Sequence, residues 1–343
     1  MSSSSRVGSA VVLLVVVSLW WALTGFADHL VGSNVRRQIQ SASWPTVQGT
    51  ITASEVESVR RARSTTHGLK LTYTYFVDGQ QHEGHNHRIM NSRSGRLEEA
   101  QALAAQYPVG ARVTVHHAPG DPSRAVLQAG LGGAELVVLL LLLPFNLVAL
   151  WLLKPLVQAF KPEPPLLSPF AREDGSECVH LDAPGTATSA AITMAAAALL
   201  CFVFTSILAG GNPPLPAGVA AWGVVIACGL FVGRHVHARK KAGHYEVRLH
   251  RREQSLSLPP IPGRKARLDV RWKDVLSLRV ESQASAKNKT RYRATLEIAT
   301  ADGTARREAV CGDTGKDRAE ALARWLRKDL QVGEVALQAL RSA

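Results

Sequence analysis

The sequence predicts a membrane α-helical protein with four transmembrane helices and two small β-rich α+β soluble domains. Three observations lead to this fold class. Four apolar stretches approach the roughly 20 residues that a helix needs to cross about 30 Å of hydrocarbon. A dense basic cluster follows the last stretch, and the two long blocks outside the stretches alternate apolar and polar residues as strands do.

The apolar stretches predict transmembrane helices at residues 10–27, 131–153, 187–208 and 215–233. The second stretch carries no charge over residues 136–153. Its Asn146 needs a polar partner or a place in the interior of a bundle, because an unpaired amide is costly in hydrocarbon. Apart from Glu135 near one end, no ionisable residue lies within the four stretches, which argues against a path for protons or ions.

The first stretch has two interpretations. A Ser-rich start, Arg6 and an apolar core resemble a secretion signal. The apolar run is long for a signal, Trp20 and Trp21 suit a membrane–water interface, and residues 24–27 form a poor cleavage site. We favour an uncleaved membrane anchor.

Charge is distributed unevenly along the chain. The net charge is +13, and residues 234–343 carry 25 basic and 13 acidic side chains, against 11 and 8 in residues 28–130. A basic block directly after a membrane span is typical of a cytoplasmic face near anionic lipid. Arg36 and Arg37 lie in the less basic block and run against this distribution.

The positive-inside rule converts these charges into an orientation. The cluster that begins at Arg234 places the C-terminus in the cytoplasm, and Lys154 and Lys161 place the following loop there too. We therefore expect a multi-pass protein of the cell inner (cytoplasmic) membrane. Its cytoplasmic parts are residues 1–9, 154–186 and 234–343, and its extracytoplasmic domain is residues 28–130.

The extracytoplasmic block predicts a β-rich domain with one helix. Alternating β-branched and aromatic residues mark the strands, and Asp78-Gly79 is a hairpin signal. The predicted elements are strands at residues 47–52, 69–77, 80–90 and 111–117, a helix at 97–106 and a turn at 118–122.

Ordered motifs in this block resemble a known family. They are Trp44-x-x-Val47-x-Gly49, Tyr73-x-Tyr75 followed by Asp78-Gly79, Tyr107-Pro108-x-Gly110, and Val113-Thr114-Val115-x-x-x-Pro119-x-x-Pro122. Over residues 44–127 the chain is similar to the bacterial membrane-protein family named domain of unknown function 3592. The resemblance implies a small β-rich domain between two membrane helices, and it implies no activity. The chain departs from the family where His82 and His116-His117 replace frequent tyrosines.

Three histidines of the second hairpin arm are candidate metal ligands. His82, His85 and His87 could together hold Zn²⁺ or Cu²⁺, which imidazole binds well. In a strand, however, His85 and His87 share one face and His82 takes the other. The competing interpretation is a set of solvated histidines on a polar strand.

The cytoplasmic block predicts hairpins followed by one amphipathic helix. Strand signals lie at residues 244–258, 266–281, 292–300 and 305–311, with a further candidate at 177–181. Thr314-x-x-Asp317 has the spacing of a capping box before the helix. The corner at Trp272 and the helix around Trp325 make residues 243–331 similar to small bacterial pleckstrin-homology-like domains.

Basic residues of this block are the candidate interaction residues. They are Arg239, Lys240, Lys241, Arg248, Arg251, Arg252, Arg264 and Lys265. One interpretation is a face that binds anionic lipid headgroups or an acidic partner, worth about 1 kcal/mol per charge near a membrane. The other is ordinary solubility and topology signalling. Nucleic acid is disfavoured, because aromatic residues are 6% of the chain and are not interleaved with the basic run.

No motif in the sequence predicts catalysis. The four cysteines form no CxxC pair, and the chain contains no GxSxG, P-loop or Rossmann glycine motif. We therefore predict no catalytic residue and no cofactor, and a non-enzymatic binding, scaffolding or signalling protein. The alternatives are a small oligomeric transporter or channel component, a metal-binding extracytoplasmic domain, and a membrane immunity or accessory protein. A membrane-protein partner or a homo-oligomer is compatible with each.

Overall fold

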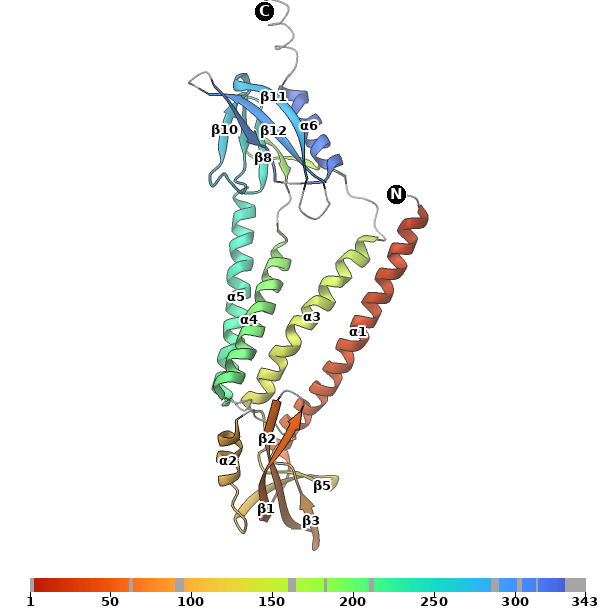
Figure 1. Ribbon diagram of the computed structural model, residues 1–343, viewed down its shortest axis with the longest axis vertical. Coiled ribbons are helices and arrows are strands. Elements are labelled where there is room, and N and C mark those ends of the chain that lie inside the picture. The colour runs from red at the N-terminus through yellow and green to blue at the C-terminus, as the bar shows by residue number, and fades with distance from the viewer. Residues whose placement is uncertain are drawn as a thin grey trace, which may run out of the picture. The chain divides into compact units, whose positions relative to one another are not determined.

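The computed structural model describes residues 3–61, 64–89, 96–159, 165–181, 184–209, 213–284, 290–300, 304–312 and 314–330. The chain divides into two compact units (Figure 1). Unit 1 comprises Met1–Lys161 and Ala187–Val232, and unit 2 comprises Pro162–Thr186 and Gly233–Ala343.

Four helices of the described chain are long and apolar enough to cross a membrane. They are α1 (Ser3–Gln40), α3 (Gly133–Ala159), α4 (Thr186–Ala209) and α5 (Leu215–Lys241). Many of their large apolar side chains are exposed, such as Leu19, Leu200 and Phe231. Outward apolar surface of this kind suits contact with lipid rather than water. Helix α1 continues well beyond the predicted apolar segment at residues 10–27.

The helices of unit 1 pack through specific contacts. Leu140 of α3 and Ala198 of α4 are buried in one cluster with apolar residues of α5. Trp21 Nε1 of α1 donates to the Ala149 carbonyl of α3 at 3.2 Å. Asn146 Nδ2 of α3 donates to Asp28 Oδ1 of α1 at 3.0 Å, which is the polar partner that the sequence demanded.

Asp28 corrects one expectation about the helices. The sequence placed Glu135 alone among ionisable residues in the apolar stretches, because the first stretch was taken to end at residue 27. Helix α1 does not end there, so Asp28 lies beside the middle of the apolar run of α3. A carboxylate beside an apolar helix is tolerated because that helix supplies a hydrogen-bond donor.

Unit 1 also contains a five-stranded antiparallel sheet with the order β3-β2-β1-β4-β5. Its strands are β1 (Thr46–Arg61), β2 (Ser64–Val77), β3 (Gln80–Gly84), β4 (Arg112–Ala118) and β5 (Asp121–Val126). A short 3₁₀ turn, η1 (Ser41–Ser43), connects α1 to β1, and helix α2 (Leu97–Ala105) lies alongside the strands (Figure 1). The predicted hairpin at Asp78-Gly79 is confirmed by the pairing of β2 with β3.

The core of this sheet explains the Tyr73-x-Tyr75 and Gly49 motifs of the sequence. Tyr73 and Tyr75 are fully buried on one face, as alternation along a strand requires, with Val115 of β4 beside them. Their hydroxyls donate to the carbonyls of Asn86 and Pro122, respectively. At Gly49, a Cβ atom would lie 2.7 Å from the side chain of Val115, so only glycine lets the strands approach this closely.

Unit 2 contains two antiparallel sheets. The first has the order β10-β9-β8-β7-β6 and the second β11-β12-β13. The strands are β6 (Pro169–Ala171), β7 (Glu177–His180), β8 (Glu246–His250), β9 (Ser255–Leu258), β10 (Leu268–Arg271), β11 (Val275–Ala284), β12 (Thr290–Ala299) and β13 (Ala305–Ala309). The predicted strands and the corner at η2 (Trp272–Asp274) are confirmed, and β7 pairs with β8 as the extra strand. Between the predicted strands at 292–300 and 305–311, the hairpin signal Asp302-Gly303 lies outside the described residues.

Helix α6 (Lys316–Leu330) covers the core of unit 2 (Figure 1). Leu322 and Leu326 are buried against residues of both sheets, including Leu256 and Leu296. The helix begins at Lys316, one residue later than a capping box with Thr314 as the N-cap would place it. The apolar face of this predicted amphipathic helix, with Leu322 and Leu326, packs on the core of unit 2.

Candidate functional site

A buried ion pair joins the sheet of unit 1 to α3. Arg88 follows β3, and Glu135 lies in the first turn of α3. Arg88 Nη2 lies 3.0 Å from Glu135 Oε2, and Nε donates to Oε1 at 3.2 Å. The two residues are only 7% and 0% exposed. A pair this buried is retained only where further hydrogen bonds satisfy both partners.

Those further bonds come from the segment before α3. Arg88 Nη1 donates to Gln128 Oε1 at 2.9 Å, and Nη2 donates to the Gly130 carbonyl at 3.1 Å. The Gly132 N–H donates to Glu135 Oε2 at 2.9 Å. The carboxylate also lies at the helix N-terminus, where the backbone dipoles favour negative charge.

Gln38 ties α1 into the same cluster. Its Nε2 donates to the carbonyls of Gln128 and Gly130, both at 2.9 Å, and its Oε1 accepts from the Ile89 N–H at 2.9 Å. Ser41 Oγ accepts from the Gly130 N–H at 3.1 Å. We call Gln38, Arg88 and Glu135 the polar clamp, because they join α1, α3 and the sheet through fully bonded buried groups.

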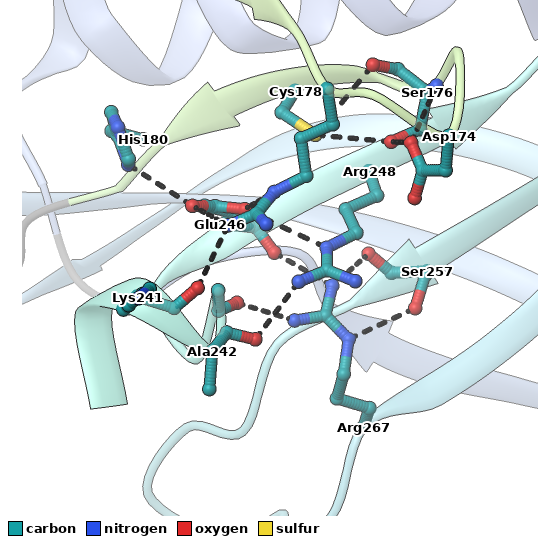
Figure 2. Close-up of polar contacts among 12 residues, drawn as sticks. Asp174, Ser176, Cys178, His180, Lys241, Ala242, Glu246, Arg248, Ser257 and Arg267 are labelled. Carbon is teal, nitrogen blue, oxygen red and sulfur yellow. Dashed lines mark hydrogen bonds and ion pairs between the residues drawn. The ribbon is translucent and has the colours of Figure 1, made fainter. Parts of the chain in front are cut away.

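A second buried cluster lies in unit 2 around Glu246 (Figure 2). Glu246 is 1% exposed and accepts from Arg172 Nη2 at 2.8 Å and Nε at 2.9 Å. Arg248 Nε and His180 Nδ1 lie within 3.6 Å and 3.7 Å of its carboxylate. The hydrogen bond to Glu246 raises the pKa of Arg172, so the guanidinium stays charged.

Three arginines of this cluster also bind the C-terminal end of α5. Arg172 Nη2, Arg248 Nη2 and Arg267 Nη1 donate to the carbonyls of Lys241, Ala242 and Gly243 at 3.3, 2.9 and 2.6 Å. Figure 2 shows Arg248 and Arg267 directed toward this backbone. Carbonyls at a helix C-terminus carry partial negative charge and lack helical partners, so cations stabilise them.

The structure divides the eight predicted basic residues into two groups. Arg248, Arg251 and Arg264 are used inside unit 2: Arg251 pairs with Asp329 at 2.9 Å, and Arg264 pairs with Glu308 at 2.8 Å. The other five are exposed or partly exposed near the end of α5 and in turns, namely Arg239, Lys240, Lys241, Arg252 and Lys265. The sequence alone does not separate the groups, because the carboxylate partners of Arg251 and Arg264 lie 78 and 44 residues further along the chain.

The predicted histidine ligands occupy three different environments. The His82 ring stacks on Tyr75 with centroids 5.8 Å apart, and His85 Nε2 lies 3.6 Å from Glu83. His87 is buried, and its Nε2 lies 3.0 Å from the Tyr107 hydroxyl. Among the described residues, no group of three or more His, Cys, Asp or Glu side chains can hold a metal ion. The structure therefore does not gather these histidines into a metal site.

Burial sets the protonation state of His87. Desolvation, with the neighbouring charge of Arg88, lowers the pKa of His87 to about 4. The imidazole is therefore neutral near pH 7, and it serves as a packed hydrogen-bonding group.

The sequence did not identify Gln38, Arg88, Arg172 or Glu246 as site residues. Glu135 offered the one signal for the polar clamp, since an acid at the edge of an apolar run needs a buried cation. Its partner lies 47 residues earlier in a polar segment with no periodic pattern, so the pairing emerges only in the fold.

The fold and these clusters define a class: a protein with four membrane-length helices and two β-rich parts. The family model of the domain of unknown function DUF3592 matches residues 47–132, which confirms the resemblance drawn from the tyrosine and glycine motifs. The match covers about a quarter of the chain and names no enzyme activity. No curated protein and no solved structure matches the chain, and the pleckstrin-homology-like resemblance of unit 2 is not confirmed.

Proposed function

We propose that this chain is a multi-pass protein of the cytoplasmic membrane that holds a DUF3592 domain on the outer surface as a binding or scaffolding platform. Four membrane-length helices support the membrane placement. The basic last turn of α5, with Arg239, Lys240 and Lys241, supports a cytoplasmic C-terminus.

The polar clamp is the observation that carries the platform role. A tethered domain needs no buried ion pair, whereas Gln38 of α1 and Glu135 of α3 both bond to the segment that follows β3. A domain held in this way presents one defined surface at the membrane, which suits recognition of a partner.

Cysteine labelling in intact cells tests the orientation. In a background with the four cysteines replaced by Ala, Phe76→Cys adds a thiol at an exposed position of β2, and Arg252→Cys adds one in unit 2. We expect a membrane-impermeant maleimide to label the first variant in intact cells and the second only after lysis. The reverse pattern would refute the proposed orientation.

We further infer that the exposed basic residues of unit 2 contact anionic headgroups. Arg252 and Lys265 support this because both are exposed, and each cation near an anionic surface contributes about 1 kcal/mol. The test is amide hydrogen exchange of residues 251–254 in nanodiscs of anionic or zwitterionic lipid. We expect slower exchange with anionic lipid, lost at high salt and in the Arg252→Gln/Lys265→Gln variant. Equal exchange in both lipids would contradict the inference. So would an Arg324→Gln variant in which anionic lipid no longer slows exchange.

A further inference from the structure

A polar cavity of about 220 Å³ in unit 1 lies next to the polar clamp, since Ile89, which lines it, donates its N–H to Gln38 Oε1. Its walls come from the last turns of α1, the residue after η1, the segment after β3 and strand β5. The lining residues include Asn34, Arg37, Trp44, Asn86, Ser123 and Arg124. None of the lining side chains is a carboxylate, and two are guanidinium groups.

Both guanidinium groups belong to exposed residues, Arg37 and Arg124, and neither forms a hydrogen bond or ion pair with any residue in the described part of the chain. The acid nearest to Arg124 along the chain, Asp121, already accepts from Ser123 N at 3.2 Å and from Ser123 Oγ at 2.5 Å. Two cations that converge on one cavity repel each other, so the arrangement favours an anionic occupant.

The helix dipole accounts for only one of the two arginines. Arg37 lies in the last turn of α1, where cations are generally favoured. Arg124 comes from β5 and has no such reason to face the same cavity. Asn34 adds an amide donor, and a planar guanidinium suits the oxygens of a phosphate.

The polar clamp shows how far this cavity lies from the apolar run of α3. Gln38, the neighbour of Arg37, bonds to the Gly130 carbonyl, and α3 begins at Gly133. The apolar run of α3 starts at Leu136, about 5 Å further along at 1.5 Å per residue. Headgroup regions extend roughly 5–7 Å beyond the hydrocarbon on each side, so this is the depth of lipid phosphates. Trp44 in the wall is a residue type that favours this zone.

We propose that this cavity binds the phosphate of an anionic membrane phospholipid in the leaflet beside the DUF3592 domain. This rests on the proposed membrane placement. It gives Arg37 a role on the outer side, where the positive-inside rule disfavours it. The acyl chains of the lipid would lie along the exposed apolar surface of α1, which includes Leu23 and Leu30.

Native mass spectrometry of the full chain in mild detergent tests the proposal. The probes are phosphatidylglycerol, phosphatidylcholine and inorganic phosphate, and the variants are Arg37→Gln, Arg124→Gln and the double variant. Arg36→Gln is the matched control, because Arg36 is an exposed neighbour that does not line the cavity. We expect phosphatidylglycerol to bind the wild type and the control equally, and each single variant about tenfold more weakly.

Three results would overturn the proposal. They are equal lipid binding by wild type and the Arg37→Gln/Arg124→Gln variant, an equal loss in Arg36→Gln, and binding of inorganic phosphate without lipid. Thermal melting separates loss of the site from loss of the fold, since neither arginine supports a described contact. Failure of the membrane placement would appear independently, in cell fractionation and in the maleimide labelling.

Discussion

Glu135 shows how one side chain at the end of an apolar helix organises its surroundings. Its carboxylate lies in the first turn of α3 and accepts hydrogen bonds from the Gly132 N–H and from the buried guanidinium of Arg88. Because no water reaches it, its charge depends on these partners. The consequence is that each member of the polar clamp matters more when removed singly than when the whole set is replaced.

Glu135→Gln should therefore destabilise unit 1 by about 3–5 kcal/mol, because it leaves the Arg88 charge buried without its counter-ion. Thermal unfolding of the full chain in detergent measures this loss. Replacing both partners, as Arg88→Met/Glu135→Leu, should recover much of it. Glu99→Gln, which breaks the more exposed pair with Arg96, is the control and should cost less than about 1 kcal/mol. Equal losses in Glu135→Gln and Glu99→Gln would contradict the clamp.

His87 predicts a pH dependence of stability. Its folded pKa of about 4 lies below the ordinary value of 6.5, so the unfolded chain binds the proton more tightly. The stabilisation is complete above about pH 6.5 and is lost as the pH falls toward 4, by roughly 3 kcal/mol. His87→Gln should flatten the melting temperature against pH in this window, whereas exposed His85→Gln should not. An unchanged slope in His87→Gln would sink the assignment.

At the scale of elements, the end of α5 is the best-defined junction in unit 2. The N–H of His244 donates to the Arg239 carbonyl and that of Gly243 to the Lys240 carbonyl, both at 2.9 Å. This is a Schellman motif, in which the residue after the cap takes a left-handed conformation, and Gly243 has φ +74°. Arg248 and Arg267 then donate hydrogen bonds to the next two carbonyls, those of Ala242 and Gly243.

Gly243→Ala should destabilise unit 2 more than Gly175→Ala. Both glycines have a positive φ, so both substitutions carry about 1 kcal/mol of backbone strain. Only at Gly243 would the new Cβ also meet the Arg248 guanidinium, whereas nothing lies within 4 Å of it at Gly175. Hydrogen exchange of β8 measures the difference. Equal effects would show that the arginines do not crowd this helix end.

Elements with a strong pattern could be predicted from the sequence, and elements without one could not. The alternation around Tyr73 and Tyr75 predicted β2 and its hairpin. Strand β1 was predicted to end near residue 52 but runs to Arg61, since its second half is polar and is held by backbone pairing with β2. Helix α1 extends beyond its apolar stretch for a similar reason. Asp28 accepts a hydrogen bond from α3, and Gln38 donates one to the segment before α3.

At the scale of the whole molecule, the excess of positive charge follows the last membrane-length helix. Residues 234–343 carry nearly all of it, beginning in the last turns of α5. Charges act on topology only within about 15–20 residues of a membrane segment, so the first few should matter most.

The variant Arg239→Gln/Lys240→Gln/Lys241→Gln should therefore weaken the proposed orientation. With less charge held inside, we expect a fraction of molecules in which Arg252→Cys is labelled in intact cells. The control is Arg271→Gln/Lys273→Gln/Arg279→Gln, which removes as much charge from exposed positions further along unit 2. These lie beyond the distance over which the rule acts, so labelling should stay at background. If both variants are labelled equally, total charge rather than its position after α5 sets the orientation.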